Sequence, residues 1–284
     1  MLAPAKINLF FHLTGKRADG YHLVNSLVAF TSIADRLTID TAPETQLTIQ
    51  GDFAKSLAEP KEQNWVLRVL REVEKHCGVA IPLHITLEKN LPVASGIGGG
   101  TADGAALLRW IRAHRSHVAP EILFSAAAFM GADGMVCLNS EPAYAEGIGE
   151  IVTPVSMPAF FIVLVNPNKP LATRDVFTRF AGAFEKQEPA PHSFTDIAGL
   201  VRYLSVRQNQ LQGAAALMMP EIQTILDSIE NTNGCLLARM SGSGATCFGM
   251  YAHAEQAKIA AQYLTQRFAG YWIEHGEAGG IYGA

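Results

Sequence analysis

The chain has 284 residues, of which 49% are hydrophobic and 17% are charged, and its formal net charge is −4. This composition is typical of a globular protein and excludes a largely disordered chain. A small negative charge without a long Lys/Arg run argues against nucleic-acid and membrane-surface partners. The length favours two domains.

Other features of the sequence bear on location. No apolar run reaches 18 residues, so we expect no membrane-spanning helix. Lys6 and Asn8 interrupt the apolar N-terminal stretch, which argues against a signal peptide. The 4 cysteines lie far apart and form no C-x-x-C pair, which indicates free thiols in a reducing cytoplasm.

In the first half of the chain, strands are expected over 5–14 and 35–50, the second broken into a hairpin at Pro43. Apolar residues at helical spacing predict an amphipathic helix over 63–77, ended by Gly78. Strict alternation over 83–89 predicts a strand with one solvated face, in an antiparallel or mixed sheet. We expect two further helices, at about 102–115 and 120–130.

The second half begins with a continuous apolar run at 160–166, which predicts a buried strand. Proline-containing segments flank this run and place a domain boundary near residue 156. Strands are also expected at 235–240 and 245–251, joined by the turn 241–244. The helices expected in this half lie near 173–184, 195–203, 207–217, 220–229 and 254–268. This order indicates a small α+β layer.

Five glycines fall between Gly96 and Gly104, directly before an expected helix. Glycine permits positive φ and a close approach to the main chain, and a helix N-terminus offers unpaired N–H groups to an anion. Three consecutive glycines cost conformational entropy that a simple turn does not require, so a phosphate site is favoured over a tight turn. The spacing fits neither G-x-x-x-x-G-K-[ST] nor G-x-G-x-x-G.

The segment LPVASGIGGGTADGAA resembles the nucleotide loop of the GHMP kinases, P-x-x-x-G-L-G-S-S-A. PAKINL (4–9), RADGYH (17–22), AYAEGIGEIVTPV (143–155) and SGSGATCFG (241–249) extend the resemblance over essentially the whole chain. It implies an α+β fold with the active site in a cleft between two domains. These would be a ribosomal-protein-S5-like, ATP-binding domain at 1–156 and a ferredoxin-like domain at 157–284.

The resemblance also implies the reaction, an ATP-dependent phosphoryl transfer to an alcohol in the cytoplasm, with Mg²⁺ as the metal. DGYH resembles the members whose acceptor carries a cytidine diphosphate. It therefore implies phosphorylation of the 2-hydroxyl of a diphosphocytidyl methylerythritol, in the non-mevalonate route to isoprenoids. We expect this small molecule as the partner, and a monomer or weak homodimer.

The proposed catalytic residues are Lys6 and Asp133. Lys6 lies between Ala5 and Ile7, where a charge is expensive unless it is paired or faces a cleft; an edge-strand lysine is the alternative. The resemblance makes Asp133 the general base for the acceptor hydroxyl and Lys6 its partner. Gly134 and Met135 replace the usual Val-Pro after this aspartate, and glycine is expected to loosen the backbone there.

The remaining site residues follow from the resemblance. Asn64 and Lys89 are expected on the adenine side, and the Thr101 hydroxyl is a candidate ligand of phosphate or Mg²⁺. The residues expected to surround the triphosphate are Pro92, Val93, Ala94, Ser95, Gly96, Ile97, Gly98, Gly99, Gly100, Thr101 and Ala102.

On the acceptor side, Tyr21 is expected to stack on the base, His22 to hydrogen-bond its edge and Phe177 to close the other face. Thr173 is expected near Phe177. Asn8 is expected to contact the methylerythritol hydroxyls or the Lys6–Asp133 pair. An exposed turn after Gly20 is the alternative for Tyr21 and His22.

Several polar residues have less specific interpretations. Asp103 is expected to cap the helix or face solvent. Arg239 is either a phosphate contact or a surface arginine, and the turn 241–244 either closes over the substrates or is an ordinary hairpin turn. Histidines without metal-ligand spacing are expected at the surface: His84, His114, His117 and His253.

Two other functions remain open. One is a GHMP kinase for homoserine, mevalonate or a sugar, against which RADGYH argues, because these acceptors have no base to stack. The other is a non-catalytic nucleotide sensor. Retention of Lys6 and Asp133 argues against a sensor, whereas Gly134 and Met135 leave it open.

Overall fold

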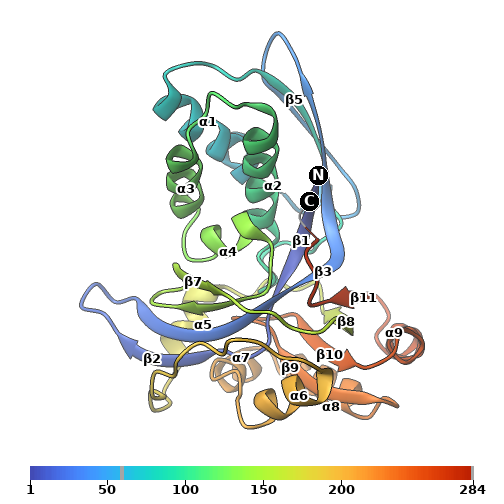
Figure 1. Ribbon diagram of the computed structural model, residues 1–284. Helices are drawn as coiled ribbons and strands as arrows, with labels where there is room; N and C mark the ends of the chain where they lie inside the picture. The colour runs from blue at the N-terminus through green and yellow to red at the C-terminus, as the bar shows by residue number, and fades with distance from the viewer. Residues whose placement is uncertain (58–60, 283–284) are drawn as a thin grey trace.

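The computed structural model describes residues 1–57 and 61–282, and its architecture is organised around one long strand, β3 (His22–Thr41). Its 20 residues extend for about 66 Å at ~3.3 Å per residue, so β3 passes through both halves of the molecule (Figure 1). Its antiparallel partners are β1 (Leu2–Asn8), β2 (His12–Lys16), β5 (Leu83–Glu88), β6 (Ala143–Glu146) and β11 (Trp272–Ala278). Four further strands complete the longest path through the sheet: β4 (Gln46–Gln50), β8 (Phe160–Asn166), β9 (Cys235–Met240) and β10 (Cys247–Tyr251). This path runs β4-β5-β3-β11-β8-β10-β9.

Helices cover one face of this sheet in the first half of the chain (Figure 1). They are α1 (Trp65–Cys77), α2 (Gly99–His114), α3 (Pro120–Phe129) and α4 (Gly134–Asn139), and they bury a large apolar core against β1, β3 and β5. Short 3₁₀ turns occupy Ala54–Ser56 and Lys61–Gln63. The predicted end of α1 at Gly78 is confirmed, because Gly78 takes the left-handed conformation with φ of 69°. Among the described residues, no helix is long and apolar enough to cross a membrane.

The expected hairpin over 35–50 is wrong. The strand β4 (Gln46–Gln50) pairs in parallel with β5, whereas β3 pairs antiparallel with the other edge of β5, from Arg36–Glu88 to Thr41–Leu83. β5 therefore lies between β3 and β4 and separates the two strands that the hairpin would have paired. The strict alternation predicted for β5 is confirmed.

The second half forms an antiparallel sheet of β8 (Phe160–Asn166), β9 (Cys235–Met240), β10 (Cys247–Tyr251) and β11. Numbered within this half, the strands stand in the order 4-1-3-2, with α9 (Ala254–Arg267) between the last two in sequence. This is the ferredoxin-like topology that was expected. The other helices are α5 (Thr173–Arg179), α6 (Ile197–Ser205), α7 (Gln212–Met218) and α8 (Glu221–Glu230).

The two halves meet through a shared core. The boundary expected near residue 156 falls between β7 (Ile151–Pro154) and β8. An apolar cluster spans this point and packs Ile7, Phe10 and Leu91 with Phe160 and Phe248. The division into domains at 156 and 157 therefore stays a prediction. The expected surface position of His84, His114, His117 and His253 and the free state of all four cysteines are confirmed.

Candidate active site

The most informative polar contact in the molecule joins Lys6 to Asp133. Lys6 lies on β1 with its side chain 4% exposed, and its Nζ is 3.0 Å from Oδ2 of Asp133, whose side chain is 41% exposed. Lys6 also donates to Oδ1 of Asn8 at 2.8 Å. The pair thus presents an accessible carboxylate beside a buried ammonium, so Lys6 is not a solvent-facing solubility lysine.

The other groups of Asn8 fix this strand in place. Its Nδ2 donates to Oγ of Ser26 at 2.8 Å, and Ser26 donates to the carbonyl of Phe10 at 2.6 Å. Its backbone N–H donates to Oγ of Ser241 at 3.1 Å. Asn8 is buried, so its amide holds the Lys6 amine in position from one side while Asp133 approaches it from the other.

The glycine-rich loop follows β5 and opens α2. Its backbone takes positive φ at Ala94 (51°), Gly96 (75°) and Gly98 (67°). Lys6 N–H donates to the carbonyl of Ile97 at 2.9 Å, which ties the loop to β1. A Cβ at Gly98 would lie 3.3 Å from Cε of Lys6 and 3.8 Å from Oδ2 of Asp133. The loop therefore turns directly against the Lys6–Asp133 pair.

The first turn of α2 faces the same region. Gly98 is the N-cap, and the helix begins at Gly99, so the N–H groups of this turn have no acceptor within the helix. Thr101 lies in this turn and is half-buried, while Gly100 is exposed. The positive end of a helix 16 residues long favours an anion at this point.

A turn from the second half of the chain packs on the loop. It covers residues 241–244, between β9 and β10. Ser241 donates to the carbonyl of Gly96 at 3.1 Å, and Thr246 N–H donates to the carbonyl of Ser95 at 3.2 Å. A Cβ at Gly96 would lie 2.6 Å from the carbonyl oxygen of Gly244. The turn is therefore a hairpin connection that also holds the nucleotide loop.

Aromatic side chains gather around His22 at the start of β3. The ring of Phe177 lies 5.3 Å from that of His22, with Phe180 at 6.3 Å and Phe184 at 6.2 Å. Thr173, at the start of the same helix as Phe177, shares a hydrogen bond with Ser243 at 2.9 Å. Tyr21 is 61% exposed. The structure thus brings His22, Thr173 and Phe177 to one side of the turn 241–244.

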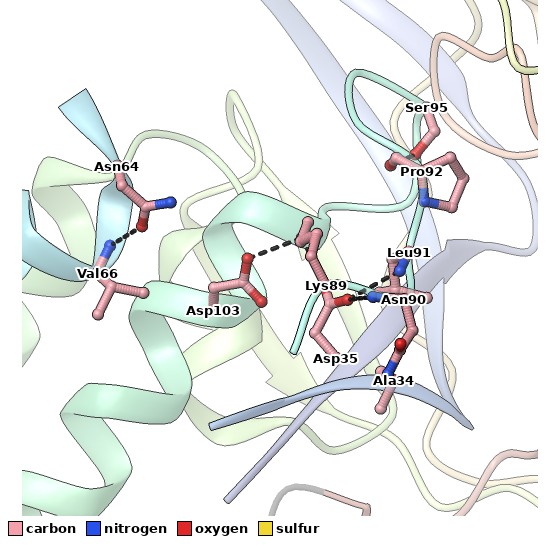
Figure 2. A network of polar contacts seen from close by, with 10 residues as sticks. All are labelled: Ala34, Asp35, Asn64, Val66, Lys89, Asn90, Leu91, Pro92, Ser95 and Asp103. Atoms are coloured by element: carbon pink, nitrogen blue, oxygen red, sulfur yellow. Dashed lines mark hydrogen bonds and ion pairs between the residues drawn. The ribbon is translucent and has the colours of Figure 1, made fainter. Parts of the chain in front are cut away.

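The expectation for Asp103 needs correction, and the residue that pairs with it is Lys89. Lys89 is buried, and its Nζ lies 2.5 Å from Oδ2 of Asp35 and 2.7 Å from Oδ2 of Asp103 (Figure 2). The amine of Lys89 is thus paired with two carboxylates, and a contact of this residue with adenine stays a prediction. Asp103 is likewise buried, so it neither caps α2 nor faces solvent, because the ammonium of Lys89 draws it inward.

Two further expectations change. Arg239 is neither a phosphate contact nor a surface residue, because it is buried and donates to the carbonyls of Leu9, Leu204 and Arg207. Gly134 does not loosen the backbone after Asp133. A Cβ at this position would lie 1.8 Å from the carbonyl oxygen of Ala127, so glycine allows α4 to pack closely on α3.

Asn64, which is expected to contact adenine, has a structural role in the fold. It caps α1, and its Oδ1 accepts from the N–H of Val66 at 2.9 Å (Figure 2). Neighbouring Trp65 packs by the nucleotide loop, since a Cβ at Gly100 would lie 3.2 Å from its Cδ1.

Sequence reasoning did not find the supporting residues Asp35, Ser26 and Phe184, and it marked Ser241 only as part of the turn 241–244. Asp35 carried a signal, because alternation along 35–39 puts it on the buried face with Leu37 and Ile39. A lone acid on an apolar face needs a buried cation. The contacts of Ser26 and Ser241 depend on tertiary pairing and had no local signal.

The region around the nucleotide loop offers few protein ligands for a divalent cation. Within residues 1–57 and 61–282, no three His, Cys, Asp or Glu side chains are grouped to hold a metal ion. Mg²⁺ keeps several waters and binds substrate phosphates with only one or two protein groups. The accessible oxygens of Thr101 and Asp133 fit that smaller requirement.

The fold and the loop define a class of protein. A model of the N-terminal domain of GHMP kinases matches residues 64–139, and a model of the GHMP kinase C-terminal domain matches residues 183–270. Solved structures share this fold: a homoserine kinase from Cytophaga hutchinsonii is 15% identical, with a TM-score of 0.66 over 97% of this chain and 92% of its own. The class is that of ATP-dependent small-molecule kinases.

Closer relatives narrow the class. A 4-diphosphocytidyl-2-C-methyl-D-erythritol kinase from Parvibaculum lavamentivorans is 45% identical, covering 98% of this chain and 97% of its own. A protein of that name from Paramagnetospirillum magneticum is 42% identical over 95% of each chain. A crystal structure of 4-(cytidine 5'-diphospho)-2C-methyl-D-erythritol kinase has 28% identity and a TM-score of 0.82 over 99% of each chain. The chain belongs to the 4-diphosphocytidyl-2-C-methyl-D-erythritol kinase family of the GHMP kinases.

Proposed function

We propose that this protein transfers the γ-phosphoryl group of ATP to the 2-hydroxyl of 4-diphosphocytidyl-2-C-methyl-D-erythritol in the cytoplasm. The observation that carries the proposal is the Lys6–Asp133 pair, 3.0 Å across, directly beside Gly98 of the nucleotide loop. A kinase needs a group that orients the acceptor hydroxyl and takes its proton close to where the γ-phosphate is held. The carboxylate of Asp133 is exposed enough to contact the acceptor. The ammonium of Lys6 stabilises its negative charge and holds it in place.

On the nucleotide side, the N–H groups of the loop and of the first turn of α2 bind the triphosphate. The positive-φ positions Gly96 and Gly98 turn the backbone so that successive N–H groups face an anion. Mg²⁺, held mainly by the phosphates with Thr101 as a candidate protein ligand, would neutralise phosphate charge.

On the acceptor side, the aromatic group around His22 binds the cytosine. Burial and the nearby positive charge of Lys16 lower the pKa of His22, so the imidazole is neutral at pH 7 and offers one donor and one acceptor to the base edge. Phe177 supplies an apolar ring beside it. Homoserine, mevalonate and galactose have no base to occupy such a pocket.

The proposal is tested by measuring ADP formation from ATP with four acceptors: the diphosphocytidyl methylerythritol, homoserine, mevalonate and galactose. We expect turnover with the first alone. Turnover of another acceptor at a higher kcat/KM would contradict the substrate assignment. ATP binding without turnover of any acceptor would instead indicate a nucleotide sensor.

We expect Tyr21→Ala to raise the acceptor KM roughly tenfold, because stacking on a base contributes ~1–3 kcal/mol. The ATP KM should stay within a factor of about two, because the substitution leaves the nucleotide loop unchanged. The matched control is Tyr263→Ala, which removes an exposed tyrosine from α9. Equal acceptor KM values in wild type and Tyr21→Ala would place the cytosine elsewhere.

A further inference from the structure

Three buried charges lie behind the nucleotide loop: Asp35, Lys89 and Asp103 (Figure 2). Asp35 comes from β3, Lys89 from the residue after β5 and Asp103 from α2. The Lys89 ammonium bridges the two carboxylates at 2.5 and 2.7 Å. The charged ends of these groups contact one another, and the reaction proposed above gives none of them a role in the chemical step.

The network is attached to both ends of the loop. At the entry, Oδ1 of Asp35 accepts from the N–H groups of Asn90 at 2.6 Å and of Leu91 at 2.8 Å. At the exit, Asp103 lies one turn into α2, and a Cβ at Gly99 would lie 3.2 Å from Nζ of Lys89. Lys89 therefore joins the strand that enters the loop to the helix that leaves it.

The two carboxylates that bind Lys89 differ in their other hydrogen bonds. Both oxygens of Asp35 accept hydrogen bonds, whereas Oδ1 of Asp103 is buried without a hydrogen-bond partner in the described structure. Two carboxylates face one ammonium, so the network holds one negative charge in excess. Burial raises the pKa of Asp103 well above its ordinary value, and a proton on this carboxyl removes the excess while leaving its bond to Lys89 available.

We propose that the Lys89–Asp103 hydrogen bond is a positioning contact for ATP, which sets the first turn of α2 against the entry of the nucleotide loop and so fixes the direction of the phosphate-binding N–H groups. The proposal rests on the ATP site assigned above. It needs a hydrogen-bond acceptor at position 103 and needs no charge there.

The test compares Asp103→Ala with Asp103→Asn. Alanine removes the bond yet leaves Lys89 balanced by Asp35, so the fold should survive, and it is also the best helix former. Asparagine keeps an acceptor for Lys89 and removes the excess charge. We expect Asp103→Ala to raise the ATP KM about tenfold, equivalent to ~1.4 kcal/mol, with the acceptor KM unchanged. The ATP KM of Asp103→Asn should stay near that of wild type.

A matched control separates positioning from stability. Leu107→Ala removes apolar volume from the buried face of the same helix without touching the network, so it should lower Tm and leave the ATP KM unchanged. An ATP KM in Asp103→Ala equal to that of wild type would overturn the proposal. So would an asparagine variant impaired as much as the alanine variant, or an equal rise in both KM values.

Calorimetric titration with a non-hydrolysable ATP analogue separates failure of the assigned ATP site from failure of the positioning role of the Lys89–Asp103 bond. If wild type does not bind the analogue, the assigned ATP site fails. If wild type binds it and Asp103→Ala binds it equally well, the site stands and the positioning role fails.

Discussion

Replacing Asp133 with asparagine should lower kcat by at least ~10², the range in which removal of a general base falls. The amide keeps the size of the carboxylate but does not accept a proton from the acceptor hydroxyl. The amine of Lys6 keeps its bond to Asn8, so the strand and the loop should hold their positions. ATP affinity should therefore stay close to that of wild type, with the loss confined to the chemical step.

Single-turnover kinetics at saturating ATP and acceptor check this expectation, with ATP affinity measured separately by titration. The control is Asp227→Asn, which neutralises an aspartate on α8, whose carboxylate accepts from Gln223 at 2.7 Å. The control should retain wild-type kcat. Wild-type kcat in Asp133→Asn would remove this residue from the reaction, and a matched loss of ATP binding would point to a metal-binding role.

The elements that the sequence predicted best are those whose signals are local. α1 has an apolar stripe and the C-terminal Gly78, and β5 alternates between buried and exposed residues. The predicted 235–240 and 245–251 strands around the turn 241–244 form β9 and β10. In each case the deciding residues lie within one turn of helix or one strand.

Elements that depend on distant pairing were missed. β3 occupies one edge of β5, so β4 pairs with the other edge. No residue between Thr41 and Gln46 indicates this pairing. β11 was not predicted, and it is placed by seven register pairs with β8 that exist only after the sheet forms. A hairpin prediction at Pro43 is reasonable from local residues and fails for this reason.

The residues of the candidate site likewise differ in how much of their role could be predicted from neighbouring residues. Lys6 had a local signal, a lysine between apolar residues, whereas Asp133 was identified by the family resemblance; the structure brings the two together. Lys89 was placed on the adenine side by the family resemblance alone, and the sequence did not show that its amine pairs with Asp35, 54 residues away. A buried charge can be identified from one strand, whereas its partner requires the fold.

Replacing Lys89 with methionine should lower the free energy of unfolding by about 3–5 kcal/mol, the usual cost of removing one partner from a buried ion pair. Methionine fills nearly the same volume, so the loss is electrostatic: Asp35 and Asp103 would remain buried without a cation. Urea unfolding monitored by circular dichroism at pH 7 measures the change as a lower midpoint with an unchanged slope. Lys169→Met, which breaks an ion pair between exposed Lys169 and Glu221, should leave the midpoint unchanged.

The stability that Lys89 contributes should depend on pH in a definite direction. The carboxylates raise the pKa of Lys89, so its charged form stabilises wild type at every pH below the ordinary lysine value, and this contribution is lost as pH rises beyond it. In Lys89→Met, falling pH protonates Asp103, whose pKa is raised by burial, and so removes its repulsion with Asp35; the deficit should therefore shrink with acidification. Adding Asp103→Asn to Lys89→Met should recover part of it at pH 7. A midpoint unchanged by Lys89→Met would mean that the ammonium does not stabilise the buried carboxylates.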